Sequence, residues 1–136
     1  MERSIIRDTF FLRQKSLPAS RDDLQTAQDL LDTLEANKDR CVGLAANMTG
    51  VLRRILVLDN EGTPLVMLNP EIISRSESYS TEEGCLSLDG TRPVTRWRKI
   101  KVRWQDTGLR TRIKTFTDFP AQIIQHEMDH FEGILI

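Results

Sequence analysis

The chain has 136 residues, with 19 lysines and arginines against 20 aspartates and glutamates, and a formal net charge of −1. This near-neutral balance argues against a dedicated nucleic-acid-binding protein. Hydrophobic residues make up 39% of the chain and charged residues 29%, which suits a single globular domain over residues 1–136 that needs no disulfide staples.

The N-terminal part is expected to combine a surface segment with one amphipathic helix. Residues 5–15 mix apolar and charged side chains without helical periodicity, which indicates a segment that wraps around the surface. Ser20 followed by Asp23 is typical of a helix start, and the helical pattern ends near Asn37. The apolar residues at helical spacing between them are Leu24, Ala27, Leu31 and Leu34. This stripe predicts a structural helix that packs on a sheet.

The middle of the chain is expected to form strands. Residues 51–58 and 64–69 are rich in β-branched and aliphatic side chains and flank a turn at 59–62. Asn69 and Pro70 are expected to end the second of these strands. A further strand is predicted over residues 71–79, with a polar second half.

A second hairpin and a last helix are expected in the C-terminal half. Residues 92–104 and 109–116 predict two strands, with core positions at Val102, Trp104, Ile113 and Phe116. Asp118 is expected to cap the helix that follows, and Pro120 suits its first turn. The residues that this helix is expected to turn toward the interior are Phe119, Ile123 and Met128. A helix packed against such strands indicates an α+β domain.

The stretch 92–103 holds six basic residues and no acidic one, with Trp97 inside it and Trp104 beside it. Basic residues interleaved with aromatic ones can bind RNA. A strand with one solvated face explains the same pattern, and the overall charge balance favours this interpretation. RNA binding is retained as the alternative.

Residues 125–130 read Q-H-E-M-D-H and contain both histidines of the chain. On a helix, His126 and His130 lie one turn apart on one face, so both imidazoles can bind one metal ion while Glu127 stands beside a bound water. Two histidines on the surface of an amphipathic helix are the alternative. The glutamate between them favours a hydrolytic metal site.

A catalytic site of this kind needs a third protein ligand. Asp129 and Glu132 leave the ligand face of the helix, so the third ligand is expected upstream, where the soft candidates are Cys41 and Cys85. Gly84 beside Cys85 allows close backbone approach and favours Cys85. A metal-bound thiolate makes a reducing compartment the natural setting. Because the sequence also has no apolar run of signal-peptide or membrane-spanning length, we expect a cytoplasmic protein.

Three segments together resemble the signature motifs of peptide deformylases. E-G-C-L-S at residues 83–87 and Q-H-E-M-D-H at 125–130 are similar to two of these motifs, and G-L-A-A at 43–46 is similar to the core of the third. They occur in the family's order, and the resemblance extends from about residue 41 to the C-terminus. It implies an α+β fold in which mostly antiparallel strands surround a central, C-terminal H-E-x-x-H helix.

The resemblance also implies an activity, namely removal of the N-formyl group from the first methionine of new polypeptides. The metal would be one divalent transition ion held by Cys85, His126 and His130, with Fe²⁺ expected and Zn²⁺, Ni²⁺ or Co²⁺ as replacements. Glu127 would move protons, and the Leu86 N–H would stabilise the oxyanion. The implied substrate-binding residues are Val42, Gly43, Leu86 and Ile123. The implied partner is a nascent formyl-methionyl chain, with a weak ribosome contact and a monomeric protein also expected.

Two positions depart from the family pattern. Met48 stands where the family has a glutamine that donates to the oxyanion, and Cys41 replaces the first glycine of that motif. Loss of one such donor typically slows an enzyme by about 100- to 1,000-fold. We therefore expect a deformylase with reduced activity, in which Asn47 or a water molecule stands in for the missing amide. The alternative is a metal-binding relative that has lost deformylation and acts on another small acyl group or only binds N-terminal peptides.

Overall fold

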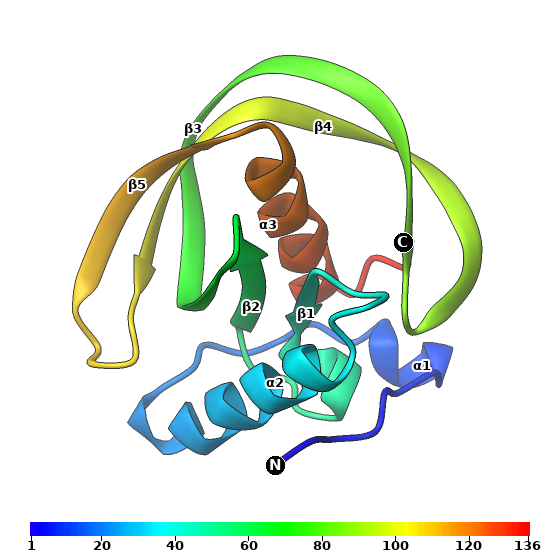
Figure 1. The fold of residues 1–136 in the computed structure, drawn as a ribbon, viewed down its shortest axis with the longest axis vertical. Helices are drawn as coiled ribbons and strands as arrows, with labels where there is room; N and C mark the ends of the chain where they lie inside the picture. The colour runs from blue at the N-terminus through cyan, green and yellow to red at the C-terminus, as the bar shows by residue number, and fades with distance from the viewer.

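The computed structural model describes all residues from 1 to 136 (Figure 1). In chain order, the elements are α1 (Thr9–Leu12), the short 3-10 helix η1 (Arg21–Asp23), α2 (Leu24–Ala36), β1 (Gly43–Ala45), the 3-10 helix η2 (Ala46–Thr49), β2 (Ile55–Asn60), β3 (Thr63–Cys85), β4 (Leu88–Gln105), β5 (Thr111–Thr117) and α3 (Asp118–Phe131). None of the helices combines the length and the apolar character that a bilayer crossing requires.

The five strands form one sheet in the order β1-β2-β3-β4-β5, and all neighbouring pairs are antiparallel. The long strands β3 and β4 curve around α3, and α2 lies below the short strands β1 and β2 (Figure 1). Ile124 and Phe131 of α3 are fully buried in the core cluster. The predicted α+β class, with a C-terminal helix at the centre of antiparallel strands, is confirmed.

Strand β3 is longer than the sequence predicts, because Asn69 and Pro70 do not end it. The pairing of β3 with β4 shifts register between Leu68 and Glu71, and Asn69 has a left-handed φ of 51°. The Asn69 side chain donates to the carbonyl oxygen of Ala19 at 2.9 Å and accepts from the Ala19 N–H at 2.8 Å. The predicted break is therefore a β-bulge whose polar side chain fastens the N-terminal segment to the sheet.

The hairpin of β4 and β5 has three of its four predicted core residues in place. Val102, Trp104 and Phe116 are buried, but the prediction for Ile113 is wrong, since 54% of this residue is exposed. Side chains alternate between the two faces of a strand, so residues three apart cannot share one face. Phe116 pairs with the buried Ile100, whereas Ile113 pairs with exposed Arg103 on the opposite face.

The start of the second helix follows the predicted pattern. The Ser20 N–H donates to the Asp23 carboxylate at 2.8 Å, and the two residues form a capping box before α2. The preceding segment departs from the prediction, because residues 9–12 form α1, with the Asp8 side chain accepting from the Phe10 N–H. Leu12 of this turn is buried, so the segment is anchored in the core rather than only wrapped around the surface.

The first turn of α3 differs from the prediction in its cap. Thr117 occupies the N-cap position, while Asp118 is the first residue of the helix and has a φ of 53°. Its carboxylate lies 3.3 Å from the Arg98 guanidinium instead of capping the helix N–H groups. β5 leads directly into α3 here, so the backbone turns sharply and carries the Asp118 side chain away from the capping position.

Candidate metal centre and its cavity

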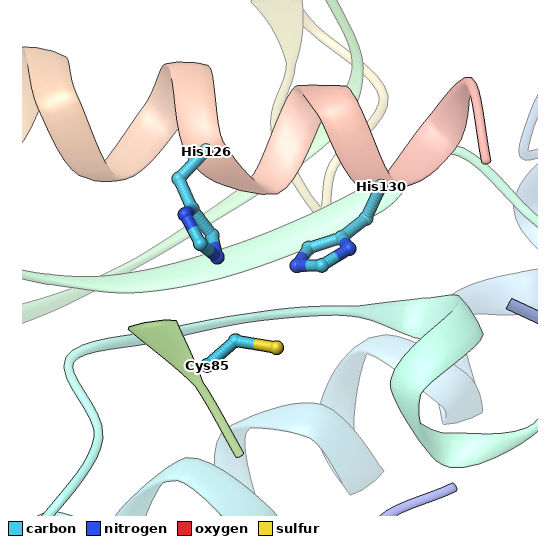
Figure 2. A group of neighbouring side chains, drawn as sticks. All are labelled: Cys85, His126 and His130. Carbon is cyan, nitrogen blue, oxygen red and sulfur yellow. The ribbon is translucent and has the colours of Figure 1, made fainter. Parts of the chain in front are cut away.

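The structure brings Cys85, His126 and His130 together. The two histidines project from one face of α3 toward Cys85, which lies at the end of β3 (Figure 2). Their possible ligand atoms, one from each residue, all lie within 4.8 Å of one another. Helical spacing explains the pair of histidines, whose ring centroids are 4.9 Å apart. Three donors at this separation can surround one metal ion.

The other residues considered as a third ligand make contacts elsewhere. The Asp129 carboxylate binds the Arg96 guanidinium at 2.6 Å, and the Glu132 carboxylate binds Arg54 at 3.1 Å. Cys41 lies in the same region, but its thiol donates to the Gly43 carbonyl oxygen at 3.0 Å. Burial raises the pKa of the Cys41 thiol to about 11, and Cys41 is not in the group of donors that converge with the two histidines.

A buried carboxylate orients His126. Oε1 of Glu83 lies 2.8 Å from Nδ1 of His126, and an ionised carboxylate only accepts, so Nδ1 carries the proton and Nε2 is left to bind a metal. Burial alone would raise the pKa of Glu83, but hydrogen bonds from His126, Arg96 and Gln122 lower it to about 2. Glu83 is therefore ionised at neutral pH, and it fixes both the tautomer and the ring orientation of His126.

Arg96 joins Glu83 on β3 to the helix. Its guanidinium donates to Glu83 at 2.7 Å and to Asp129 at 2.6 Å, and only 5% of the residue is exposed. Gln125 fastens the same helix to β4, because its side chain accepts from the Trp97 N–H and donates to the Trp97 carbonyl oxygen, each at 2.8 Å. These contacts fix the position of α3 relative to β3, which carries Cys85, and to β4. The sequence analysis included Glu83 in a motif and Arg96 in the basic stretch 92–103, but it predicted neither as a residue that orients the metal ligands.

Glu127 lies beside the three donors. Burial raises its pKa to about 7, and its Oε1 atom has no hydrogen-bond partner in the protein. Oε1 is 3.9 Å from Nε2 of His130, which is also buried without a partner. Two orphaned polar atoms side by side are unusual in a protein interior, where nearly all such groups are paired. Both atoms are consistent with a site that receives a metal ion and a water molecule.

Glycine at position 43 is required by close packing against α3. A Cβ atom there would lie 2.6 Å from Cγ2 of Ile123 and 3.1 Å from Oε2 of Glu127. Any side chain would therefore push β1 away from the helix and from Glu127. This explains in physical terms why a glycine stands beside the proposed proton carrier.

An open cavity of about 580 Å³ leads to this site. The four residues predicted to bind substrate all line it, as do Met48, Cys85, His126 and Glu127; the four are Val42, Gly43, Leu86 and Ile123. Phe119 also lines the cavity and is 56% exposed, so its predicted interior position is wrong. It lies one turn before Ile123 on the same face of α3, and that face looks into the open cavity. Arg7 and Arg40 line the cavity too and were not predicted.

Comparison with known proteins identifies the family. The sequence model of the polypeptide deformylase family matches residues 6–136. The chain belongs to the peptide deformylase family. It is 48% identical to a peptide deformylase of Clostridium beijerinckii over 136 residues, which cover all of both chains. It is also 40% identical over 113 residues to a deformylase of Dictyoglomus thermophilum, covering 82% of this chain and 72% of that one.

Solved deformylase structures share the fold. A class I type b peptide deformylase from Acinetobacter baumannii superposes with a TM-score of 0.90 at 30% identity, over 99% of this chain and 96% of that one. A deformylase from Legionella pneumophila gives a TM-score of 0.89 at 35% identity, over 99% and 83% of the two chains. The homologues support a hydrolase, and deformylases are metalloenzymes.

Within this deformylase fold, Met48 faces the cavity where the family resemblance places a glutamine. It is 1% exposed and has no side-chain N–H or O–H group. The neighbouring amide of Asn47 does not replace the missing donor. Its Nδ2 donates to the carbonyl oxygen of His130 at 3.1 Å, and Asn47 does not line the cavity.

Proposed function

We propose that this protein is a metal-dependent peptide deformylase that removes the N-formyl group from the first methionine of newly made polypeptides and releases formate. The observation that carries the proposal is the convergence of Cys85, His126 and His130 next to buried Glu127 and an open cavity. Since nascent chains begin at the ribosome, the proposed activity places the protein in the cytoplasm.

The donor set fits a transition metal. Two imidazoles and one thiolate leave a fourth position open in a tetrahedral site, and Nε2 of His130 is buried without a hydrogen-bond partner. We propose Fe²⁺ as the native ion, on the family resemblance, while Zn²⁺, Ni²⁺ and Co²⁺ also suit these ligands. When bound, such an ion lowers the pKa of a coordinated water to about 7 and polarises a substrate carbonyl.

Glu127 is the proton carrier in this proposal. Its carboxylate takes a proton from the attacking water as the water oxygen adds to the formyl carbon. It then gives that proton to the methionine nitrogen as the C–N bond breaks, which yields formate and a free amine. Burial raises the pKa of Glu127 to about 7, so the group can both accept and return a proton near neutral pH.

The cavity walls suit a formyl-methionyl peptide. Val42 and Ile123 supply apolar surface for the methionine side chain, and the Leu86 N–H donates to the developing oxyanion. β1 is the edge strand of the sheet and begins at the cavity with Gly43. An edge strand offers its backbone N–H and C=O groups to an extended peptide, which gives the nascent chain a path away from the metal.

One assay tests the proposed function directly. The protein is loaded with Fe²⁺ under anaerobic conditions and given formyl-Met-Ala-Ser, and the released formate is measured. We expect turnover that disappears when the metal is removed with a chelator. A fully metal-loaded, folded protein that releases no formate but cleaves acetyl-Met-Ala-Ser would favour a relative with another acyl substrate.

Met48→Gln is expected to raise kcat on the formyl peptide. The new amide can donate to the oxyanion, and one such donor typically changes the rate by about 100-fold or more. Because the hydrogen bond strengthens in the transition state, the gain should appear in kcat rather than in KM. Cys41→Gly combined with Met48→Gln tests whether the bulk of Cys41 misaligns the loop.

Met48→Leu is the matched control for this gain, since it keeps an apolar side chain of similar volume and adds no donor. We expect its kcat to equal that of the unchanged protein. If the double variant binds metal and folds but still releases no formate, a merely slowed deformylase is the wrong interpretation.

We also propose a weak ribosome contact through a basic groove on strands β3 to β5. Its volume is about 280 Å³, and it is lined by Ser74, Arg75, Ser76, Lys99, Lys101 and Thr115, with no carboxylate among them. Cations and hydroxyls of this kind bind phosphate oxygens. Other basic residues of the 92–103 stretch are held in ion pairs, namely Arg96, Arg98 and Arg103.

Sedimentation with ribosomes tests this contact. Lys99→Ala with Lys101→Ala should lower the fraction of protein that pellets in about 50 mM salt, and about 200 mM salt should release the unchanged protein. Lys15→Ala with Lys38→Ala removes the same charge elsewhere and should have no effect. Equal pelleting of both double variants would show that the groove does not contact ribosomes.

A further inference from the structure

The segment before α1 contacts both elements that flank the proposed oxyanion position. The Ile6 N–H donates to the carbonyl oxygen of Met48 at 2.8 Å. Nη1 of the next residue, Arg7, donates to the carbonyl oxygen of Leu86 at 2.9 Å, and its Nη2 binds the Asp89 carboxylate at 2.8 Å. In Figure 1 this segment and α1 lie beside the turn that joins β3 to β4. Two adjacent residues thus bridge two walls of the cavity.

The contact with Leu86 restrains the backbone that carries the oxyanion donor. Leu86 follows Cys85, whose sulfur is fixed by the proposed metal, so the peptide plane between them is held from one side. Arg7 holds the next carbonyl group along the chain from the other side. The Leu86 N–H and the Leu86 C=O belong to successive peptide planes that meet at the Leu86 Cα, so only φ and ψ of Leu86 separate the group that Arg7 holds from the oxyanion donor. Without Arg7, only the Cys85 side would be fixed.

The same contact contributes little to stability. The side chains of Arg7 and Asp89 are 56% and 97% exposed, and ion pairs between exposed groups have small effects on folding. Because the ion pair of Arg7 adds little to the free energy of folding, we expect the main effect of Arg7 to be on the local geometry of Leu86, whose carbonyl oxygen it binds. The site also lacks the glutamine amide of the family, so alignment of the remaining donor matters more.

We propose that Arg7 is a positioning residue for the deformylation reaction, which directs the Leu86 N–H toward the oxyanion through its hydrogen bond to the Leu86 carbonyl. The inference rests on the proposed deformylase function. Arg7 itself does not donate to the reacting atoms. It acts on the transition state through Leu86, so its removal should lower kcat and leave KM unchanged.

The test compares Arg7→Ala with two other variants in the Fe²⁺-loaded protein, using formyl-Met-Ala-Ser. Arg7→Ala should lower kcat on the order of 10-fold, since small misplacements of a catalytic group have effects of this size or larger. Arg7→Lys should restore part of the loss, because an ammonium can still donate to the Leu86 carbonyl. Arg103→Ala is the matched control, since Arg103 is 47% exposed and forms an ion pair of the same 2.8 Å length, with Glu71.

The outcomes separate this inference from the proposed function. No formate release by the unchanged protein would overturn the deformylase proposal itself. If the unchanged protein is active and Arg7→Ala has the same kcat and KM, Arg7 has no effect on the reaction and the positioning role is overturned. If Arg7→Ala raises KM and leaves kcat unchanged, Arg7 binds the substrate directly, which also overturns the positioning role. Asp89→Ala removes the ion pair but leaves the hydrogen bond between Arg7 and Leu86 in place. If Asp89→Ala lowers kcat as much as Arg7→Ala does, the positioning role is also contradicted. Thermal denaturation should give nearly the same Tm for Arg7→Ala and Arg103→Ala.

Discussion

Glu127→Gln is expected to retain the metal and to lower kcat on formyl-Met-Ala-Ser by about 1,000-fold or more, a scale typical of a lost general base. Glu127 is buried with an unpartnered Oε1, and its pKa is raised to about 7. Glu83, the carboxylate that contacts His126, is held by hydrogen bonds to His126 and Arg96 and is not free to take up the proton. Glutamine has nearly the same shape and cannot accept the proton of the attacking water.

Elemental analysis and steady-state kinetics on the same preparation measure this effect. Glu132→Gln is the matched control, since Glu132 follows α3, is exposed and binds Arg54. It should keep both metal and activity. If Glu127→Gln loses the metal instead, Glu127 is a ligand and the proton-transfer role must be withdrawn.

The grouping of Cys85, His126 and His130 was predictable, because two of the three donors are histidines four residues apart on one helix. Histidines four residues apart must share a helix face, and the E-G-C-L-S motif supplied the thiol through a family resemblance. The structure places the three side chains together, as expected. Their binding of a metal ion remains a prediction.

The contacts that orient these donors could not be predicted. Glu83 and His126 are 43 residues apart in the chain, and Arg7 and Leu86 are 79 apart. Such pairs depend on how curved strands cross a helix, which has no local periodic signal. The sequence shows that Glu83 is acidic and that Arg96 is basic, but only the fold shows that both are buried against α3.

Fold class was predictable, whereas strand lengths were not. Alternating apolar residues and turn signals indicated strands before a final helix. Asn69 and Pro70 looked like a strand end, because proline cannot donate to a ladder. In the structure the bulge absorbs both residues, and β3 continues as far as Cys85. This continuation has a functional consequence, since it carries the proposed thiolate ligand to the helix.

Cys85→Ala is expected to abolish stoichiometric metal binding and, with it, all formate release. Removing one of three ligands leaves two imidazoles, and Cys85 is the only thiol in the group of three donor atoms. Protein purified without chelator should contain close to one transition metal per chain before the change and nearly none after it. Circular dichroism on both proteins checks that the fold survives, and Cys85→Ser provides a second, closer replacement.

Cys41→Ala is the matched control, because it removes the other thiol of the chain from the same cavity. Its thiol donates to the Gly43 carbonyl oxygen, and it is not in the group of donors that converge with the two histidines, so we expect it to contribute no ligand. We expect full metal content in this variant. Metal retained in Cys85→Ala and lost in Cys41→Ala would show that the other thiol is the ligand, and the loop from residue 41 to 48 would then have to move toward the histidines.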